Sequence, residues 1–281
     1  PGDREVHDVA DRKVLVPDVV GVYTVTATVT TPEGEIALSA DVTGALYVGA
    51  GMYVGDGPEW PQCALCHEEN ADGWIHTGHA RAFSEGIDGI STDHFRESCI
   101  KCHSVGYDPT PGAENGGFDD VARLLGWTFP EELKPGNWEA MPDALKDVSN
   151  VQCESCHGPG SEHFGRVTGN RISLSTSSGD CGQCHDAEPY HVKVEEWNHS
   201  RHAVATRYPT GEGRQSCVAC HSGIGFIEAT DGVPTAELST EWEAIVCAAC
   251  HDPHSAENHY QLRTVTPVEL GNGHVVVAGG N

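Results

Sequence analysis

Basic residues are scarce in this chain. Lys and Arg total 16 against 42 Asp and Glu, which gives a formal net charge of −26 at pH 7. Phosphate backbones and anionic membranes repel such a surface, so no nucleic-acid partner is expected. No apolar run approaches the roughly 18 residues that a transmembrane helix requires, and no membrane span is predicted. The acidic residues are scattered rather than grouped in blocks, which is typical of a solvated surface.

The amino-acid composition does not favour long helices or large sheets. Hydrophobic residues make up 38 % of the 281 residues, whereas glycine and proline contribute 33 and 16. This favours a loop-rich fold of mainly short α-helices with little regular secondary structure. The chain begins at Pro1, without a methionine or a signal-like apolar segment, and we expect a processed, secreted protein.

Cysteine is absent from the first 58 residues, and each of the twelve cysteines that follow belongs to a Cys-x-x-Cys-His motif. This motif is the attachment signature of c-type haem, in which both thiols bond to the porphyrin and the adjacent imidazole binds iron. Structural zinc and thioredoxin-like redox pairs need no histidine after every second cysteine, and they are disfavoured for that reason. The motifs are, in chain order, Cys63 with Cys66 and His67, Cys99 with Cys102 and His103, Cys153 with Cys156 and His157, Cys181 with Cys184 and His185, Cys217 with Cys220 and His221, and Cys247 with Cys250 and His251.

Six covalently attached c-type haems are therefore the predicted cofactors, with the six motif histidines as proximal iron ligands. Shared among six haems, the chain supplies about 47 residues each, too few for an ordinary apolar core around every cofactor. We expect the short helices to wrap around the haems. Because c-type haem is attached on the oxidising side of the membrane, the periplasm or the cell exterior is the expected location.

The sequence divides into three segments, and the central one contains an internal duplication. A β-rich N-terminal segment is expected at 1–58, a hexahaem region at 59–263 and a short β tail at 264–281. Cys63 to Cys99 and Cys181 to Cys217 both span 36 residues, and "WIHTGHA" at 74–80 matches "WNHSRHA" at 197–203. Two related haem triplets, at about 59–165 and 178–263, describe this pattern most simply.

Local patterns predict a few elements. Alternating Val, Thr and Tyr from residue 21 and a Pro-Glu-Gly turn at 32–34 predict a β segment of three or four strands, which could form a small sheet or pair with an edge elsewhere. "DDVARLLGW" and "MPDALKDV" predict two short helices, with Asp119 or Asp120 capping the first and Pro142 starting the second.

The second axial ligand of each iron is expected to be histidine, because the chain has only two methionines. The two histidines of each repeated heptapeptide lie three residues apart, so each can reach a different haem. The candidate distal ligands are His76, His79, His163, His199, His202 and His254. His259 is the rival of His254, and His7 could serve a neighbouring subunit. His94, His191 and His274 are interpreted as exposed or hydrogen-bonded histidines.

Several stretches resemble a known family. "CHSVGY", "CESCHGPGSEHF", "WxHSxHA" and "CHDPHS…QLR" are similar to multihaem c-type cytochromes, a family that includes the tetrahaem cytochrome of nitrifying bacteria and extracellular cytochromes that polymerise into conductive filaments. The resemblance covers roughly residues 60–263. It implies closely stacked bis-histidine haems that pass single electrons, in an extracellular protein, with a periplasmic location as the alternative.

The resemblance also implies partners. Other electron carriers or extracellular acceptors are expected, as is self-association into a filament; the N-terminal β segment departs from the family pattern and could act in polymerisation or anchoring. This hypothesis makes the chain an electron-transfer protein rather than an enzyme. The alternative is a periplasmic multihaem reductase of nitrite, hydroxylamine or a sulfur oxyanion, with one open iron; its candidate cluster is Arg201-His202 with Arg207-Tyr208.

Overall fold

The computed structural model of the chain divides into two compact units. One unit comprises Pro1–Cys66 and Arg81–Leu174, and the other comprises His67–Ala80 and Ser175–Asn281. The first repeated heptapeptide therefore belongs to the same unit as the last three haem motifs. The structure describes residues 6–9, 12–15, 17–32, 34–50, 63–110, 112–163, 172–187, 191–204, 213–239, 243–269 and 274–276.

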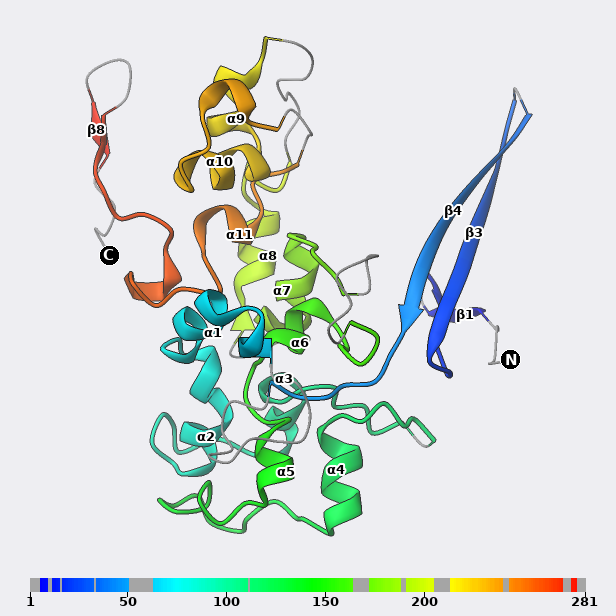
Figure 1. Ribbon diagram of the computed structural model, residues 1–281, viewed down its shortest axis with the longest axis vertical. Coiled ribbons are helices and arrows are strands. Elements are labelled where there is room, and N and C mark those ends of the chain that lie inside the picture. The colour runs from blue at the N-terminus through cyan, green and yellow to red at the C-terminus, as the bar shows by residue number, and fades with distance from the viewer. Residues whose placement is uncertain are drawn as a thin grey trace. The chain divides into compact units, whose positions relative to one another are not determined.

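Short helices and irregular loops dominate the described residues (Figure 1), which confirms the predicted fold class. No described helix exceeds eight residues. The helices of the first unit are α2 (Ala82–Ile87), α3 (Ile100–His103), α4 (Phe118–Leu125), α5 (Asp143–Lys146) and α6 (Cys153–His157). Those of the second unit are α1 (Glu68–Ile75), α7 (Ser178–His185), α8 (Lys193–Asn198), α9 (Gln215–His221), α10 (Gly223–Thr230) and α11 (Cys247–Cys250).

The N-terminal strands form two separate antiparallel pairs rather than one sheet. β1 (Val6–Val9) pairs with β2 (Arg12–Leu15), and β3 (Gly21–Thr31) pairs along its full length with β4 (Gly34–Gly44). The β-branched residues that alternate along β3 suit an extended backbone. In the second unit, β5 (Asp186–Ala187) pairs with β6 (His191–Val192), and β7 (Val268–Glu269) with β8 (Val275–Val276).

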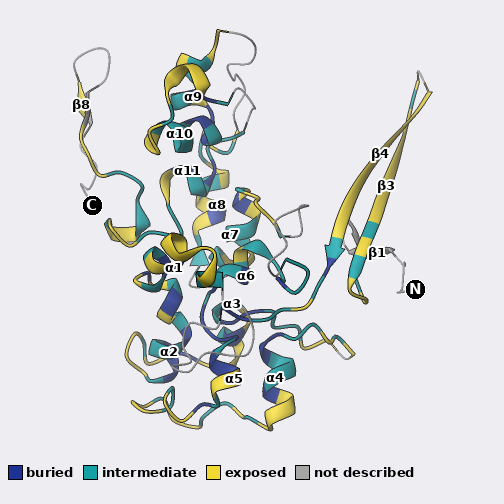
Figure 2. Cartoon of the chain, in the orientation of Figure 1, coloured by how far each residue is buried: buried dark blue, intermediate teal, exposed yellow. Residues whose placement is uncertain are grey.

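An aromatic core fills the first unit around α2, α4 and α5. Phe83 lies against Phe95 and Phe118, with ring centroids 5.6 and 5.3 Å apart. Figure 2 shows the buried parts of these helices in dark blue. The core contains Phe83, Ile87, Phe95, Ile100, Val105, Phe118, Ala122, Met141, Leu145 and Val148. Part of the chain therefore builds a conventional apolar core of its own, beside the second haem motif.

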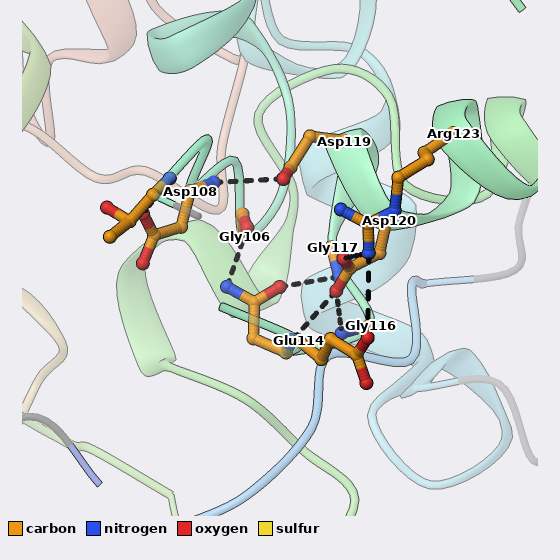
Figure 3. A network of polar contacts seen from close by, with 10 residues as sticks. Gly106, Asp108, Glu114, Gly116, Gly117, Asp119, Asp120 and Arg123 are labelled. Carbon is orange, nitrogen blue, oxygen red and sulfur yellow. Dashed lines mark hydrogen bonds and ion pairs between the residues drawn. The ribbon is translucent and has the colours of Figure 1, made fainter. Parts of the chain in front are cut away.

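The two predicted helices of the insertion are present as α4 and α5, but the expected cap of α4 is wrong. Gly117 occupies the N-cap of α4, and Asp119 and Asp120 lie in its first turn. Figure 3 shows their carboxylates reaching back to the preceding loop: Asp119 accepts from the Asp108 amide at 2.9 Å, and Asp120 from the Gly116 amide at 2.9 Å. These acids thus fasten the loop that follows the second motif instead of capping the helix.

Within the described residues, none of the helices combines the length and the apolar character required to span a bilayer.

Candidate haem sites

The cysteines of each haem motif lie on or directly beside a short helical turn. The first motif begins on a 3₁₀ turn at Cys63–Leu65, the second lies on a 3₁₀ turn at Glu97–Cys99 and on α3, and the other four lie on α6, α7, α9 and α11. Residues three apart on such a turn share a face, so both cysteines of a motif can bond to one macrocycle. All twelve cysteines lie in the described part of the chain and none forms a disulfide. Thiols on a common face fit the thioether attachment of c-type haem.

The two cysteines of a motif differ in their exposure. The six leading cysteines are all half-buried, namely Cys63, Cys99, Cys153, Cys181, Cys217 and Cys247. Among the six trailing cysteines, four are exposed and two are half-buried; the exposed ones are Cys66, Cys156, Cys220 and Cys250, and the half-buried ones are Cys102 and Cys184. In four of the six motifs, therefore, the first thiol is half-buried and the second is exposed. Attachment of haem through these twelve thiols stays a prediction from the motifs.

The first and third motifs of the first unit meet through their leading cysteines. The Cys153 thiol donates a hydrogen bond to the Cys63 sulfur, which lowers the pKa of Cys63 and raises that of Cys153. The second unit repeats this contact between its first and third motifs, where a hydrogen bond from Cys181 is the main cause that lowers the pKa of Cys247 to about 6. In both units, therefore, the leading cysteine of the first motif contacts the leading cysteine of the third motif.

Three candidate ligand histidines are oriented by backbone carbonyls. His157 Nδ1 lies 2.6 Å from the Ser173 oxygen, and His251 Nδ1 lies 2.8 Å from the Tyr260 oxygen. His199 Nδ1 lies 2.8 Å from the Glu195 oxygen. A carbonyl only accepts hydrogen bonds, so Nδ1 is the protonated nitrogen in each ring. The lone pair of Nε2 is then available to bind a metal, as in a typical ligating imidazole.

A cluster of histidines surrounds His185, the motif histidine of α7. The ring of His79, from the first repeated heptapeptide, lies with its centroid 6.0 Å from that of His185. The ring of His191 lies at 5.8 Å on β6. Burial, reinforced by His191 and His251, lowers the pKa of His185 and keeps its ring neutral, as metal binding requires. Two histidines thus compete for one position beside His185.

The sequence interpretation of His191 did not anticipate this position. A signal was present, because His191 follows His185 by six residues, the spacing at which His163 follows His157. The β5–β6 pairing sets Ala187 opposite His191, so the same short hairpin carries His185 and His191.

Packing of α1 positions the histidines of the first repeated heptapeptide. A Cβ placed on Gly73 would lie 2.1 Å from the His254 carbonyl oxygen, so only glycine allows this approach. Trp74 is buried, and the Thr77 hydroxyl donates to the Trp74 carbonyl at 2.7 Å. In the second copy of the repeat, the Trp197 indole donates to the Ile245 carbonyl at 2.9 Å. Both tryptophans therefore hold their histidine-bearing turns by packing.

The other predicted distal ligands are distributed over both units. His76 is the C-cap of α1, His163 follows α6, and His202 is exposed after α8. His254 lies with Nδ1 3.6 Å from an Asp252 oxygen, and its rival His259 packs on Tyr260 with ring centroids 3.8 Å apart. For His7 only the backbone is described, in β1.

An open hollow lies beside the second motif. Its volume is about 570 Å³, and its lining includes Phe95, Phe129, Leu133 and Arg96. Phe95 also meets the His103 ring edge to face, with centroids 5.3 Å apart. Three acidic residues, Asp93, Glu97 and Glu131, also line the hollow and oppose the acidic substituents of a haem, so the lining does not identify a macrocycle site.

A buried carboxylate inside the third motif binds the segment that follows the β strands. Glu154 is only 2 % exposed, and its oxygens accept from the amides of Val48 at 3.0 Å, Gly49 at 2.7 Å and Gly160 at 2.6 Å. Burial raises the pKa of Glu154, and these amide donors offset part of the rise. Residues 46–50, here named the linker segment, are therefore fastened to the third haem motif.

Asp147, next to the linker segment, makes the fold sensitive to pH. Burial, with a smaller contribution from Asp143, raises the pKa of Asp147 to about 6. Its Oδ1 atom is buried and has no hydrogen-bond partner among the described residues. Because the folded-state pKa lies above the unfolded value, the folded chain holds an extra proton between about pH 4 and pH 6. Stability attributable to this group falls as the pH rises through that window.

Replacing Asp147 by asparagine is expected to stabilise the haem-loaded protein above pH 6. The gain should be about 1–2 kcal/mol, allowing for screening of this partly exposed group, and it should vanish near pH 4, where the wild-type carboxyl is protonated. Thermal unfolding of both proteins between pH 4 and pH 8 measures the difference. A difference in Tm that does not change with pH would contradict the assignment.

Comparisons with known proteins agree with this chemistry. Residues 62–122 match the family described as cytochrome c554 and c-prime. The C-type polyheme cytochrome OmcB of Geobacter sulfurreducens, from two strains, is 25 % identical over 225 residues, which are 76 % of this chain and 25 % of OmcB. The multiheme cytochrome MtrA of Shewanella baltica is 23 % identical over 150 residues, which are 44 % of this chain and 42 % of MtrA. No solved structure matches the chain significantly.

The chain thus spans about a quarter of OmcB and less than half of MtrA. The match to the family covers the first two haem motifs, and the motifs themselves recur through the rest of the sequence. Motif chemistry, thiols on common helical faces and imidazoles with Nδ1 bonded to carbonyls all indicate the same cofactor. Together with the family match and the two relatives, they support a multihaem c-type cytochrome.

Proposed function

We propose that the chain carries single electrons along six closely spaced c-type haems with two histidines on each iron. The observation that carries this proposal is the repeated contact between leading cysteines, Cys63 with Cys153 and Cys181 with Cys247. Each macrocycle is bonded to its own cysteine, so cysteines in contact hold two macrocycles side by side. Each bound haem supplies an iron that accepts and releases one electron.

The proposed attachment uses both thiols of every motif. Pairing each leading cysteine with the trailing cysteine of the same helical turn leaves no thiol of the chain unused. The proposed pairs are Cys63 and Cys66, Cys99 and Cys102, Cys153 and Cys156, Cys181 and Cys184, Cys217 and Cys220, and Cys247 and Cys250.

His79 and His185 are the proposed axial pair of the fourth motif. An imidazole nitrogen lies about 2 Å from the metal it binds, so two imidazoles on opposite faces of one iron have centroids about 6 Å apart. The separation of 6.0 Å between His79 and His185 fits this value. His191 lies equally near, but the β5–β6 hairpin brings it from the same backbone stretch as His185. Axial ligands approach from opposite faces, which favours His79.

The remaining irons are proposed to take His76, His163, His199, His202 and His254 as distal ligands, with His67, His103, His157, His221 and His251 as proximal ligands. His259 and His7 are the weaker distal candidates. The proposed triplets, about 59–165 and 178–263, then share a ligand, because His79 lies between the first two motifs in sequence but beside the fourth in space.

The proposed location is extracellular, with the periplasm as the alternative, and the proposed partners are electron carriers or extracellular acceptors together with further copies of the chain in a filament. The acidic surface supports partners that carry basic patches, which it would attract over a distance. Two residues of the candidate reductase cluster, Arg207 and Tyr208, lie outside the described residues. The exposed Arg201-His202 pair does not distinguish a closed iron from an open one.

The haem count and the coordination state together test this proposal. Mass spectrometry of the denatured holoprotein should show six covalent haems, and the reduced protein should bind no carbon monoxide. Low-temperature electron paramagnetic resonance of the oxidised form should contain only low-spin signals. One high-spin iron per chain that binds carbon monoxide would instead support the reductase, and electron microscopy of the native protein would decide whether filaments form.

A further inference from the structure

The hairpin of β3 and β4, here named the ribbon, has two chemically different faces. Its register sets Ala27 opposite Leu38 and Val29 opposite Ile36, whereas Thr28 and its partner Ala37 fall between these pairs. Side chains alternate between faces along a strand, so the apolar ones gather on one side. The apolar face consists of Tyr23, Val25, Ala27, Val29, Ile36, Leu38, Ala40 and Val42. The polar face consists of Val22, Thr24, Thr26, Thr28, Thr30, Glu35, Ala37, Ser39, Asp41 and Thr43.

The two faces of the ribbon differ in how favourably they are solvated by water. On the polar face, Thr24 donates to Asp41 at 2.7 Å, and the hydroxyls of Thr26 and Ser39 lie 3.0 Å apart. On the apolar face, Val29 is 51 %, Ile36 53 % and Leu38 63 % exposed. Figure 2 shows the length of the ribbon in yellow, the colour of exposed residues. A two-stranded hairpin is marginally stable in water by itself, so a partner on the apolar face would stabilise the ribbon.

Charge and shape identify a second copy of the chain as the partner. The chain carries a net charge of −26, which opposes contact with anionic lipid or with another copy at most surfaces. The apolar face has no charged side chain. Its polar groups are the Tyr23 hydroxyl, which donates to Asp18 at 2.9 Å, and the Thr31 hydroxyl at the turn, which donates to the Gly34 carbonyl at 2.9 Å. Two copies can therefore meet at this face without opposing like charges. A basic partner would find only one acid to bind, Asp18, beside Tyr23 at one end of the face.

The size of the apolar face sets the strength of this contact. Strands of eleven residues are about 37 Å long, and a two-stranded face is about 10 Å wide. Two such faces in contact would remove roughly 1,000 Å² of accessible surface, which lies at the lower end for a specific, reversible interface. Small Ala27 is paired with larger Leu38, and small Ala40 with larger Val25. The large side chains of a second ribbon can therefore pack into the spaces above the two alanines.

We propose that the apolar face of the ribbon binds the same face of a second copy, forming a small two-layer β-sandwich about a two-fold axis. Sheets packed face to face in this way lie about 10 Å apart and interdigitate their inner side chains. Such a contact is self-complementary and closes as a dimer. The proposal refines the self-association put forward above, but it does not depend on haem ligation or on filament formation.

Sedimentation velocity of the haem-loaded chain from 1 to 200 µM, concentrations of about the scale expected for a weak interface, tests the proposal. Wild-type protein should dimerise reversibly. The double variant Ala27→Lys with Leu38→Lys should raise the dimer Kd at least about tenfold, because it buries four cations per dimer. The matched control, Thr28→Lys with Ala37→Lys, makes the same charge change on the other face and should leave Kd within about threefold. Leu38→Thr keeps a strand-forming residue and should weaken the dimer without added charge.

Three outcomes would overturn the ribbon contact: a wild-type chain that stays monomeric at the highest concentration, equal effects of the two lysine pairs, or a dimer Kd that the Ala27 and Leu38 changes leave unaltered. The last result would leave the filament proposal standing. Discrete dimers that never extend, and that only the apolar-face variants dissociate, would support the ribbon contact while contradicting the filament. An unchanged haem spectrum in every variant would show that the haem region remains folded.

Discussion

Replacing His79 by alanine is expected to open one iron of the chain. The His79 ring faces the motif histidine His185 at 6.0 Å between centroids, so its removal would leave that iron with one protein ligand. The reduced variant should then bind carbon monoxide at one haem per chain, and the oxidised variant should gain a high-spin signal. Carbon monoxide titration at the Soret band and low-temperature paramagnetic resonance measure both effects.

The matched control is His191→Ala, which removes the second ring near His185, at 5.8 Å between centroids. It should leave all irons low-spin and closed to carbon monoxide. Methionine in place of His79 should restore a sixth ligand and raise the potential of that haem, since thioether ligation raises haem potentials. If His191→Ala opened the iron and His79→Ala did not, the two assignments would be exchanged.

Replacing Glu154 by alanine is expected to cost about 3–5 kcal/mol of stability, the range for removing one partner of a buried, charge-assisted network. The change would leave the amides of Val48, Gly49 and Gly160 buried without their acceptor. It would also release the linker segment from the third motif, so proteolysis between the ribbon and the haem region should accelerate. Thermal unfolding followed in the Soret band, and a timed digest, measure the two effects.

Glu139→Ala is the control for this prediction, because Glu139 is exposed and lies in the same unit. Its effect should stay within about 0.5 kcal/mol, as is usual for surface substitutions. Glu154→Gln retains one acceptor oxygen and should fall between the two. A Glu154→Ala protein as stable as the Glu139 variant would mean that water replaces the carboxylate at the three amides.

The amino-acid sequence predicted the local features of this protein well. The short helices α4 and α5 and the long hairpin are set by residues close together in the chain, through helical spacing, proline and strand alternation. The cap of α4 was predicted wrongly for a local reason. An aspartate at the start of a helix can bind either its own first turn or a preceding loop, and here the loop donates closer amides.

Interactions between distant residues were decided only by the tertiary structure. His79 meets His185 because Gly73 lets α1 approach the His254 carbonyl, a contact that no spacing in the sequence reveals. The contact of Cys63 with Cys153 and the burial of Glu154 likewise depend on packing between remote segments. The sequence by itself determined which cofactor this chain binds, since thioether attachment needs only neighbouring residues. That His79 lies beside the motif histidine His185 was decided by the fold, because this contact joins remote segments of the chain.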